Sequence, residues 1–471
     1  LQLDDSCDAG NAQGCTFPSP ELTASALADT TWRPDAPLAV RSAVPVGTRY
    51  YWRVRACRSG LCSEWSSVSY LEVGRVANDL NGDGYSDVIL GAPSRDGEGK
   101  VLVHYGSALG AMPAAGALLA PPSPNAGQDY GVTLAAGDVN GDGFADLAVG
   151  APKLDGAEGN DEGGVFLYLG GPSGVAPTPL QSLTSPTPQP DAQFGLGLAM
   201  EGDVDADGLI DLAIGAPGQD STKNGVGALW VLRGTATGVD DSAPWAVANP
   251  SDETDAGFGV SIVLGDVTGD GLADLAASTS NGRVYVLLSN GAQFLPLVPA
   301  NQLNIASFTS TQGLSMHGDE AGHGRLGMVV GPRWGCCYWN GFYRYVGTPT
   351  GVTSAGSASK GVYYPHYWGY ASGNGGDFNG DGRQEIVIAT PAGWDPTSGY
   401  VDVATADDSS VSVVSTLSNP LGYVGGEFGD AVTTRSDADG DGYSDLVVGA
   451  PGENDVFVYY GAPTGLPATP E

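Results

Sequence analysis

The stretch DVNGDGFADLAVGAP, residues 138–152, decides the fold of this chain. It joins an acidic, glycine-containing loop to a short apolar run that ends in Gly-Ala-Pro. Related loops are DLNGDGYSD at 79–87, DVDADGLID at 203–211, DVTGDGLAD at 266–274, DFNGDGRQE at 377–385 and DADGDGYSD at 437–445. Because DEAGHGRLG at 319–327 falls in the same register, there are seven copies, loops 1 to 7 in chain order, with a period of about 60 residues. Such a period is typical of repeat architectures.

The residues around the loops repeat as well. An aromatic-glycine pair precedes five loops, at Tyr130-Gly131, Phe194-Gly195, Phe258-Gly259, Trp368-Gly369 and Phe428-Gly429. After the loop come an apolar run such as VILGAP, an alternating stretch such as GKVLVHYG, and a weaker apolar patch such as ALLA at 117–120. Each unit therefore predicts four short antiparallel strands with glycine-rich turns. Four-stranded units in this number describe a β-propeller, so we predict an all-β chain with seven blades over residues 75–471.

The charge balance restricts the possible partners. The 471 residues include 54 acidic and 19 basic side chains, for a net charge of -35. Such a field repels nucleic acid and anionic lipid, so neither is an expected partner. No apolar run reaches the roughly 18 residues that a membrane span needs, so we expect no membrane insertion by this chain.

The six cysteines form three close pairs: Cys7 and Cys15, Cys57 and Cys62, and Cys336 and Cys337. An even count at short separations predicts local disulfides and an oxidising compartment, which places the protein outside the cell or at its surface. Free buried thiols are the alternative. No signal peptide is evident, so we expect a mature or trimmed exported chain.

The acidic loops have the pattern of calcium sites. Oxygen-bearing side chains occupy positions 1, 3, 5 and 9, position 6 is glycine, and position 7 offers its backbone carbonyl oxygen. Ca²⁺ takes 6–8 oxygen ligands in flexible geometry, whereas Mg²⁺ tolerates irregular sites less well. The predicted ligand residues are Asp79, Asn81, Asp83, Tyr85, Asp87, Asp138, Asn140, Asp142, Phe144, Asp146, Asp203, Asp205, Asp207, Leu209, Asp211, Asp266, Thr268, Asp270, Leu272, Asp274, Asp377, Asn379, Asp381, Arg383, Glu385, Asp437, Asp439, Asp441, Tyr443 and Asp445.

An ordinary Asx-rich hairpin turn would also use Asn-Gly and Asp-Gly. Six loops, however, keep positions 1, 3, 5 and 9 as Asp, Asn, Thr or Glu. We therefore expect six Ca²⁺ ions with a structural role, bound most weakly at Thr268 in loop 4. Loop 5 carries Ala321, His323 and Gly327 where the others have ligands, so we expect it to be empty.

The pattern FG…GDVNGDGxxDLxVGAP resembles the FG-GAP repeat of the integrin α-subunit head, over roughly residues 75–471. This resemblance implies a seven-bladed propeller with calcium in the hairpins between strands 1 and 2 on one face and ligand recognition on the opposite face. Here six of the seven repeats carry a calcium-type loop. This high number is similar to that in bacterial and other non-integrin relatives, so we expect a bacterial surface protein. No inserted metal-dependent adhesion domain interrupts the repeats, so the integrin ligand mechanism does not carry over.

Residues 1–74 have a different character. The alternating GTRYYWRVRAC, followed by RSGLCSEWSS and VSYLEVG, resembles the last two strands of a fibronectin type III module, with Cys57 and Cys62 closing their hairpin. The piece is short for such a module, so we expect a partial one. At the other end, the fourth strand of the seventh blade either lies outside the chain or is replaced by a segment near 66–74. In both cases we expect a segment of a longer surface protein.

Two aromatic-rich stretches, 334–345 and 363–370, are the best candidates for a recognition surface. The integrin-like topology implies that both lie on the face opposite the calcium loops, where Trp and Tyr suit a sugar ring or a protein partner. Packing between blades 5 and 6 is the alternative. The candidate ligand-binding residues are Trp334, Tyr338, Trp339, His366 and Tyr367. For the adjacent Cys336 and Cys337 we expect a vicinal disulfide, with two free thiols as the alternative.

Catalysis has little support in the sequence. There is no nucleophile elbow and no usual zinc spacing, and HGDEAGH at 317–323 is more simply a degenerate acidic loop than a His-Asp-His metal site. We therefore predict a non-enzymatic, calcium-stabilised binding or adhesion module for a protein or glycan. The alternatives are a passive structural module of a surface assembly and the accessory propeller of an extracellular hydrolase.

Overall fold

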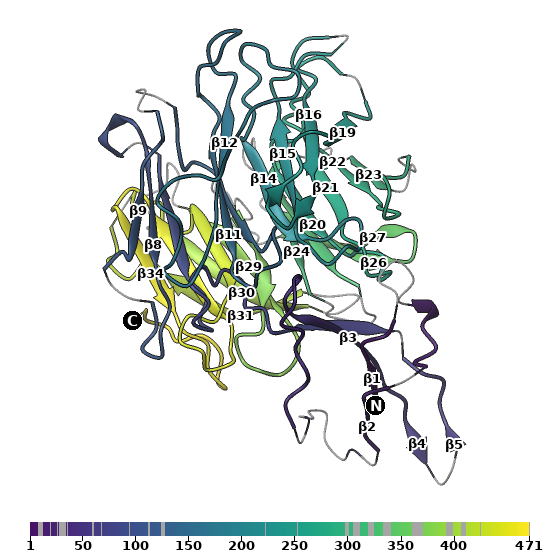
Figure 1. The fold of residues 1–471 in the computed structure, drawn as a ribbon. Coiled ribbons are helices and arrows are strands. Elements are labelled where there is room, and N and C mark those ends of the chain that lie inside the picture. Colours follow the sequence, from purple (N-terminus) through teal and green to yellow (C-terminus); the bar gives the residue numbers. More distant parts are fainter. Residues whose placement is uncertain are drawn as a thin grey trace.

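The structure is a computed structural model (Figure 1), and it describes most of the chain. The described residues are 1–7, 13–18, 20–25, 27, 34, 36–58, 61–66, 68–93, 95–111, 114–123, 128–221, 223–251, 253–296, 301–304, 311–318, 325–332, 341–359, 371–391, 399–406, 411–423 and 425–470. Within these ranges the chain is all-β apart from short 3-10 turns such as η2 (Arg95–Gly97). None of the described residues forms a helix with the length and apolar character of a membrane span.

Among the described residues of the repeats, five antiparallel sheets have four strands each, and in each of these the order in space follows the order in the chain. The first is β10 (Leu134–Gly137), β11 (Asp146–Ala151), β12 (Gly164–Tyr168) and β13 (Gln181–Leu183). The second is β14 (Gly197–Gly202), β15 (Asp211–Ala216), β16 (Ala228–Leu232) and β19 (Trp245–Ala248), with the ribbon β17 (Gly234–Thr235) and β18 (Gly238–Val239) between the last two. The third is β20 (Ile262–Gly265), β21 (Asp274–Ser278), β22 (Arg283–Leu287) and β23 (Gln302–Asn304).

The fourth sheet is β24 (Thr311–His317), β25 (Gly327–Pro332), β26 (Gly341–Thr348) and β27 (Gly351–Ser359). The fifth is β28 (Ala371–Gly376), β29 (Glu385–Thr390), β30 (Tyr400–Ala406) and β31 (Val411–Ser418). Loops 2 to 6 each join the first strand of a sheet to the second. The predicted unit of four short strands is therefore confirmed for these five repeats.

The first and last repeats have three strands each among the described residues. They consist of β7 (Val88–Ala92), β8 (Lys100–His104) and β9 (Ala117–Leu119), and of β32 (Ala431–Ser436), β33 (Asp445–Ala450) and β34 (Asp455–Tyr459). The suggestion that a segment near 66–74 completes the last sheet is wrong, because β6 (Ser69–Val73) pairs with β3 (Thr48–Arg53) instead. β6 is the edge strand of the N-terminal sheet, and among the described residues the last sheet has no strand beyond β34.

Successive repeats lie side by side. The first strands β10, β14, β20, β24, β28 and β32 each contact the next one in this order. The first and last sheets also meet: Ser107 N–H donates to the Ala438 carbonyl oxygen at 2.9 Å, and Ala111 N–H donates to Tyr460 Oη at 2.9 Å. Figure 1 accordingly places β8 and β9 beside β34. The architecture, many four-stranded antiparallel sheets packed face to face, is consistent with a β-propeller.

The repeated aromatic-glycine pairs form the core of each repeat. The four described aromatic rings are almost fully buried and contact an aromatic ring of the third strand, with centroid distances of 5.6–5.8 Å. The contacts are Tyr130 with Phe166, Phe194 with Trp230, Phe258 with Tyr285, and Phe428 with Phe457. The glycine of Gly-Ala-Pro meets the next pair, since a Cβ on Gly215 would clash with the Gly259 carbonyl oxygen. These motifs are thus the contacts between neighbouring sheets.

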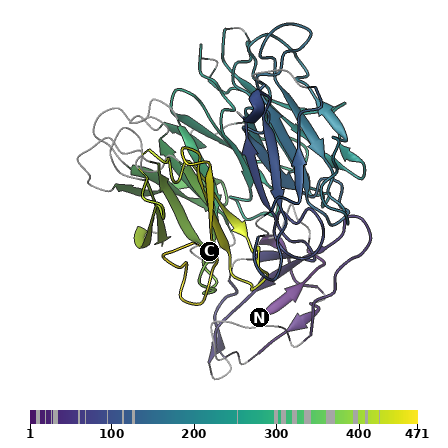
Figure 2. The same cartoon turned by 90° about the vertical axis from the view of Figure 1, so that its left-hand side faces the viewer.

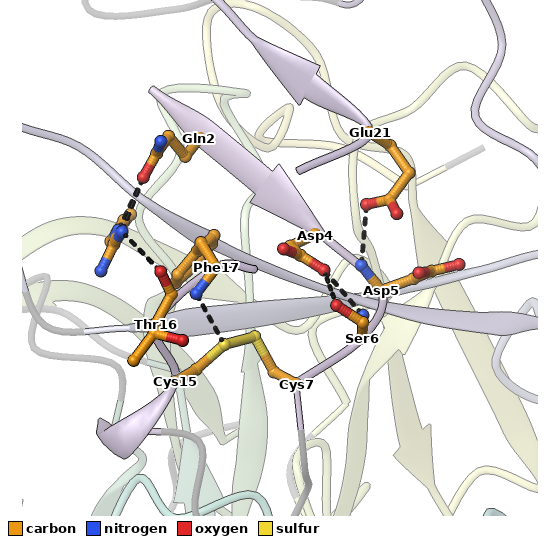
Figure 3. The surroundings of a disulfide bond; sticks show 10 residues. Gln2, Asp4, Asp5, Ser6, Cys7, Cys15, Thr16, Phe17 and Glu21 are labelled. Carbon is orange, nitrogen blue, oxygen red and sulfur yellow. Dashed lines mark hydrogen bonds between the residues drawn. A yellow bond between two sulfur atoms is a disulfide. The ribbon is translucent and has the colours of Figure 1, made fainter. Parts of the chain in front are cut away.

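The N-terminal segment, residues 1–74, lies at one end of the sheets (Figures 1 and 2). Its main sheet has the order β2 (Leu22–Thr23), β1 (Gln2–Asp4), β3, β6, and a hairpin joins β4 (Cys57–Arg58) to β5 (Leu61–Cys62). Two predicted disulfides are confirmed: Cys7 with Cys15, and Cys57 with Cys62 across the hairpin. Figure 3 shows the first, which packs against the small core of Phe17, Tyr51 and Val68.

Candidate calcium loops

The six acidic loops share one set of hydrogen bonds, illustrated by loop 2. The position 1 carboxylate, Asp138, accepts the backbone N–H of Asp142 at 3.1 Å and of Gly143 at 3.0 Å. Asp142, at position 5, accepts the N–H of Phe144 at 3.0 Å. In all six loops the backbone N–H of the glycine at position 6 donates a hydrogen bond to the carboxylate at position 1, at 2.8–3.1 Å. The glycine at position 6 has a positive φ every time, as the sharp turn requires.

The side chain at position 3 also forms a hydrogen bond within the loop, but its partner in loop 4 differs from that in the other five loops. The Asn residues of loops 1, 2 and 6 and Asp205 and Asp439 accept the N–H of position 5 at 2.8–3.3 Å. Thr268 instead donates its hydroxyl to Asp266 Oδ1 at 3.3 Å. The oxygens at positions 1, 3 and 5 therefore gather around one turn in each of the six acidic loops.

The position 9 carboxylate has a role that the sequence analysis missed. In loop 2, Asp146 accepts the N–H of Val139 on Oδ2 at 3.1 Å and that of Gly170, just after the third strand, on Oδ1 at 3.0 Å. The corresponding acceptor pairs occur at Asp87, Asp211, Asp274 and Asp445. In loop 6, Glu385 accepts the N–H of Phe378 and the side-chain amide of Asn379. This carboxylate ties the loop to the sheet, and each oxygen keeps a lone pair for a cation.

Burial makes these carboxyl groups poor anions on their own. Desolvation, followed by repulsion from the neighbouring carboxylates of the same loop, raises the pKa of every position 9 group. The pKa rises to about 7 for Asp87, about 8 for Asp146, about 8 for Asp211, about 7 for Glu385 and about 7 for Asp445, and well above the ordinary value for Asp274. Desolvation also raises the pKa of Asp266, at position 1, to about 6. Buried carboxylates of this kind call for a cation.

Two loops bring three carboxylates within ligand distance of one another. The groups are Asp203, Asp205 and Asp211 in loop 3, and Asp437, Asp439 and Asp441 in loop 7, with oxygens within 4.8 Å. These are the two loops that carry four carboxylates in the sequence. Asp437 Oδ1 is buried and has no hydrogen-bond partner in the described part of the chain. Hard oxygen donors that converge with an unpartnered buried oxygen fit a calcium ion.

The loops are also linked to one another. The backbone N–H at position 8 donates to the carbonyl oxygen of position 1 in the preceding loop. The donor and acceptor pairs are Ala145 and Asp79 (2.8 Å), Ile210 and Asp138 (3.2 Å), Ala273 and Asp203 (2.8 Å), Leu326 and Asp266 (2.9 Å), Ser444 and Asp377 (3.0 Å), and Ser86 and Asp437 (3.0 Å). The last pair joins the first loop to the seventh, so the series runs from the end of the chain back to its beginning.

Several expectations fall on residues outside the described ranges. These are the ligand positions Ala321 and His323 of loop 5, the candidate ligand-binding residues Trp334, Tyr338, Trp339, His366 and Tyr367, and the cysteine pair Cys336 and Cys337. Of the aromatic residues nearby in β26, Phe342 and Tyr345 are buried in two different core clusters, and Tyr343 packs against the cluster that contains Tyr345. The strand residues of the first aromatic stretch are thus packing residues.

A third acidic group lies outside the repeats. Asp4, Asp5 and Glu21 approach one another in the N-terminal segment, where Asp4 is buried and accepts hydrogen bonds from Ser6 (Figure 3). No motif in the sequence indicates this group, because its members meet only where the end of β1 lies beside the start of β2.

The sheets and loops together define an all-β repeat protein with acidic, calcium-type loops. Residues 74–104, 130–168, 194–232, 258–287, 368–414 and 428–465 match the FG-GAP repeat. Loop 5 lies between the fourth and fifth matched segments. The chain is 38% identical over 164 residues to integrin alpha-4 of Xenopus laevis, covering 32% of this chain and 15% of that protein.

Two further relatives match in the same way. Identity is 32% over 245 residues with integrin alpha-PS2 of Drosophila melanogaster (48% of this chain, 17% of the relative), and 36% over 149 residues with human integrin alpha-10 (30% and 12%). The chain carries FG-GAP repeats and is homologous to integrin alpha subunits, although it matches less than a fifth of the length of these relatives. Homology and two disulfides indicate an extracellular domain.

Proposed function

We propose that this chain is a calcium-stabilised extracellular binding module that supports adhesion to a protein or a glycan. The observation that carries the proposal is the set of six equivalent loops, each with buried carboxyl groups that a cation would neutralise. The integrin alpha homologues are non-enzymatic, which favours binding over catalysis. A bacterial origin remains part of the proposal, on the strength of the calcium-type loops in six repeats.

The proposed fold is a closed propeller of seven blades over residues 75–471, preceded by a partial fibronectin type III module at 1–74. The hydrogen bond from Ser86 to Asp437 supports closure, because it repeats the geometry found between consecutive loops. The hairpin β4–β5 with its disulfide supports the fibronectin assignment.

Calcium would be held by positions 1, 3, 5 and 9 of loops 1, 2, 3, 4, 6 and 7, with the carbonyl oxygen of position 7. The bound ion would supply positive charge at the turn between the first and second strands, where no helix braces the sheet. The chain's own part is to fix the oxygens in place through the backbone hydrogen bonds of positions 1 and 9. Equilibrium dialysis with ⁴⁵Ca²⁺ on the full chain should count six ions, and a protein that binds none would overturn the proposal.

The proposed ligand site is the surface of Trp334, Tyr338, Trp339, His366 and Tyr367. Residues 333–340 join β25 to β26, and loop 5 joins β24 to β25, so antiparallel pairing puts these two connections at opposite ends of one sheet. The described strand ends support the same placement for the second stretch, because β27 ends at Ser359, β28 begins at Ala371, and loop 6 follows the other end of β28.

A glycan array and a pull-down from a matrix extract would identify the ligand. The double variant Trp334→Ala, Trp339→Ala should lose binding at least about tenfold, the effect of removing one aromatic anchor. Tyr423→Ala is the matched control, because Tyr423 is 62% exposed and belongs to repeat 6. Binding that survives the double variant refutes the aromatic site, and a wild-type chain without any ligand favours a passive structural module.

A further inference from the structure

The N-terminal segment, together with Arg75 directly after it, donates hydrogen bonds to backbone carbonyl groups of three of the six calcium-type loops. Val46 N–H donates to the Gly141 carbonyl oxygen of loop 2 at 2.7 Å. In loop 4, Arg49 Nη1 donates to the Gly271 carbonyl at 2.7 Å. Gln13 Nε2 donates to the Gly269 carbonyl of the same loop at 2.8 Å.

Arg75, directly after the segment, reaches the third loop. Its Nη2 donates to the Gly208 carbonyl oxygen of loop 3 at 2.8 Å, and its Nε donates to the Val46 carbonyl at 2.7 Å. The same Nε lies 3.8 Å from Asp138 Oδ2 of loop 2. Arg75 thus joins two neighbouring loops to the turn at Val46.

All four loop carbonyls belong to positions 4 or 6. The proposed calcium ligands are the side chains at positions 1, 3, 5 and 9 and the carbonyl at position 7. The hydrogen bonds of the N-terminal segment and Arg75 therefore use carbonyl oxygens that a bound ion would leave free, and the Arg75 contact with Asp138, at 3.8 Å, is longer than a hydrogen bond, so cover and ion can be in place together.

These contacts divide the loops into covered and open ones. Loops 1 and 2 share the residues Asn-Gly-Asp-Gly at positions 3 to 6, yet Gly82 is exposed in loop 1 and Gly141 is buried in loop 2. Pro45 lies over the covered tips: a Cβ on Gly141 would be 2.9 Å from Pro45 Cα, and one on Gly208 would be 3.1 Å from Pro45 Cγ. In loop 4 positions 4 and 6 are buried. In loop 3 the contact is confined to position 6, where Gly208 is half-buried, while Ala206 and Asp207 at positions 4 and 5 are exposed. In loops 6 and 7 positions 4 to 6 are all exposed.

We propose that the N-terminal segment is a cover that gates ion exchange at loops 2, 3 and 4, so that the calcium sites fall into a slow, covered class and a fast, open class. An ion can leave a covered loop only after the cover opens locally, and such opening slows release. Coupling is reciprocal: an ion that fixes a loop also fixes the carbonyls to which the cover is bonded, so calcium holds the N-terminal segment in place. The inference rests on the proposed calcium binding.

Calcium release from the full chain tests the gate. The protein is loaded with Ca²⁺ and mixed in a stopped-flow instrument with an excess of a fluorescent calcium chelator. Two phases of equal amplitude are expected, the slow one from loops 2, 3 and 4. In the double variant Arg49→Ala, Arg75→Ala, the slow phase should accelerate about tenfold or more, since two charged donors to loop carbonyls are lost. The fast phase should not change.

Arg55→Ala is the matched control, because Arg55 belongs to the same segment and stacks on Trp65. It should leave both phases unchanged. If the double variant folds poorly, amide hydrogen exchange in the wild-type protein gives a second readout. It compares Gly143 in the covered loop 2 with Gly84, which occupies the same position in the open loop 1. Calcium removal should deprotect Val46, whose N–H bonds to loop 2.

The outcomes separate the two proposals. No ion release at all overturns calcium binding and the gate with it. Release of all ions in one phase overturns the gate alone, and so does a slow phase that persists unchanged in the double variant.

Discussion

The backbone N–H of Ser86 lies 3.0 Å from the carbonyl oxygen of Asp437, to which it donates a hydrogen bond. Ser86 Oγ in turn accepts the N–H of Asp437 at 3.1 Å. The same two bonds join Ser444 and Asp377, at 3.0 and 3.2 Å, within the chain. The first and seventh loops are therefore connected as two consecutive loops are.

This pair of serines gives a test of closure. Ser86→Ala and Ser444→Ala each remove one side-chain acceptor from a backbone N–H, so each should lower the free energy of unfolding by about 1 kcal/mol. Urea denaturation monitored by tryptophan fluorescence measures both. If Ser444→Ala destabilises the protein and Ser86→Ala does not, the first and last repeats are separate in solution.

The position 9 carboxylate should matter without calcium. In loop 4 both oxygens of Asp274 accept backbone N–H groups, and the amide nitrogen of Asp274→Asn cannot accept one. We expect this variant to lose about 1–3 kcal/mol of stability in the calcium-free protein, the effect of one unsatisfied buried donor. Asp270→Asn, at position 5, should lower the melting temperature mainly when calcium is present. Equal behaviour of the two variants in EGTA would contradict the structural role of position 9.

The repeats were predictable because their signals are local. A loop of nine residues contains its own turn glycine and most of its own hydrogen bonds, and the strands follow from alternation on either side. The aromatic-glycine pairs stand out as a motif in the sequence, and their packing between sheets is the physical reason for the repeat.

The features that escaped prediction join distant parts of the chain. Asp146, at the start of β11, bonds to Gly170, just after the neighbouring strand β12, and Arg49 reaches Gly271 across 222 residues. Nothing in the local sequence of Arg49 distinguishes it from an ordinary solvated cation. The cover over loops 2 to 4 therefore follows only from the arrangement in space.

The Gly-Ala-Pro glycine should tolerate no side chain. In Gly215→Ala the added Cβ would clash with the carbonyl oxygen of Gly259 in the next repeat, and backbone atoms cannot turn aside as a side chain does. Overpacking of this kind costs about 1–3 kcal/mol. Gly171→Ala is the control, because its Cβ would meet no atom within 4 Å. Thermal unfolding should separate the two variants by several degrees, and equal melting temperatures would mean that neighbouring repeats do not approach so closely.

Calcium and pH should act on stability together. The pKa of Asp146 and of Asp211 is raised to about 8 in the folded calcium-free protein, from 3.8 in the ordinary state. Between these values the folded state keeps a proton that the unfolded state releases, so the stability of the calcium-free protein falls as pH rises from about 4 to about 8. Calcium replaces those protons, so its stabilising effect should grow as the pH rises over the same range. At a free calcium concentration a hundredfold above Kd, each site should add about 2.7 kcal/mol to the free energy of unfolding. Scanning calorimetry at pH 5 and pH 8, with and without CaCl₂ and with MgCl₂ as the control, measures this. A melting temperature at pH 8 that does not respond to calcium would contradict a cation role for the loops.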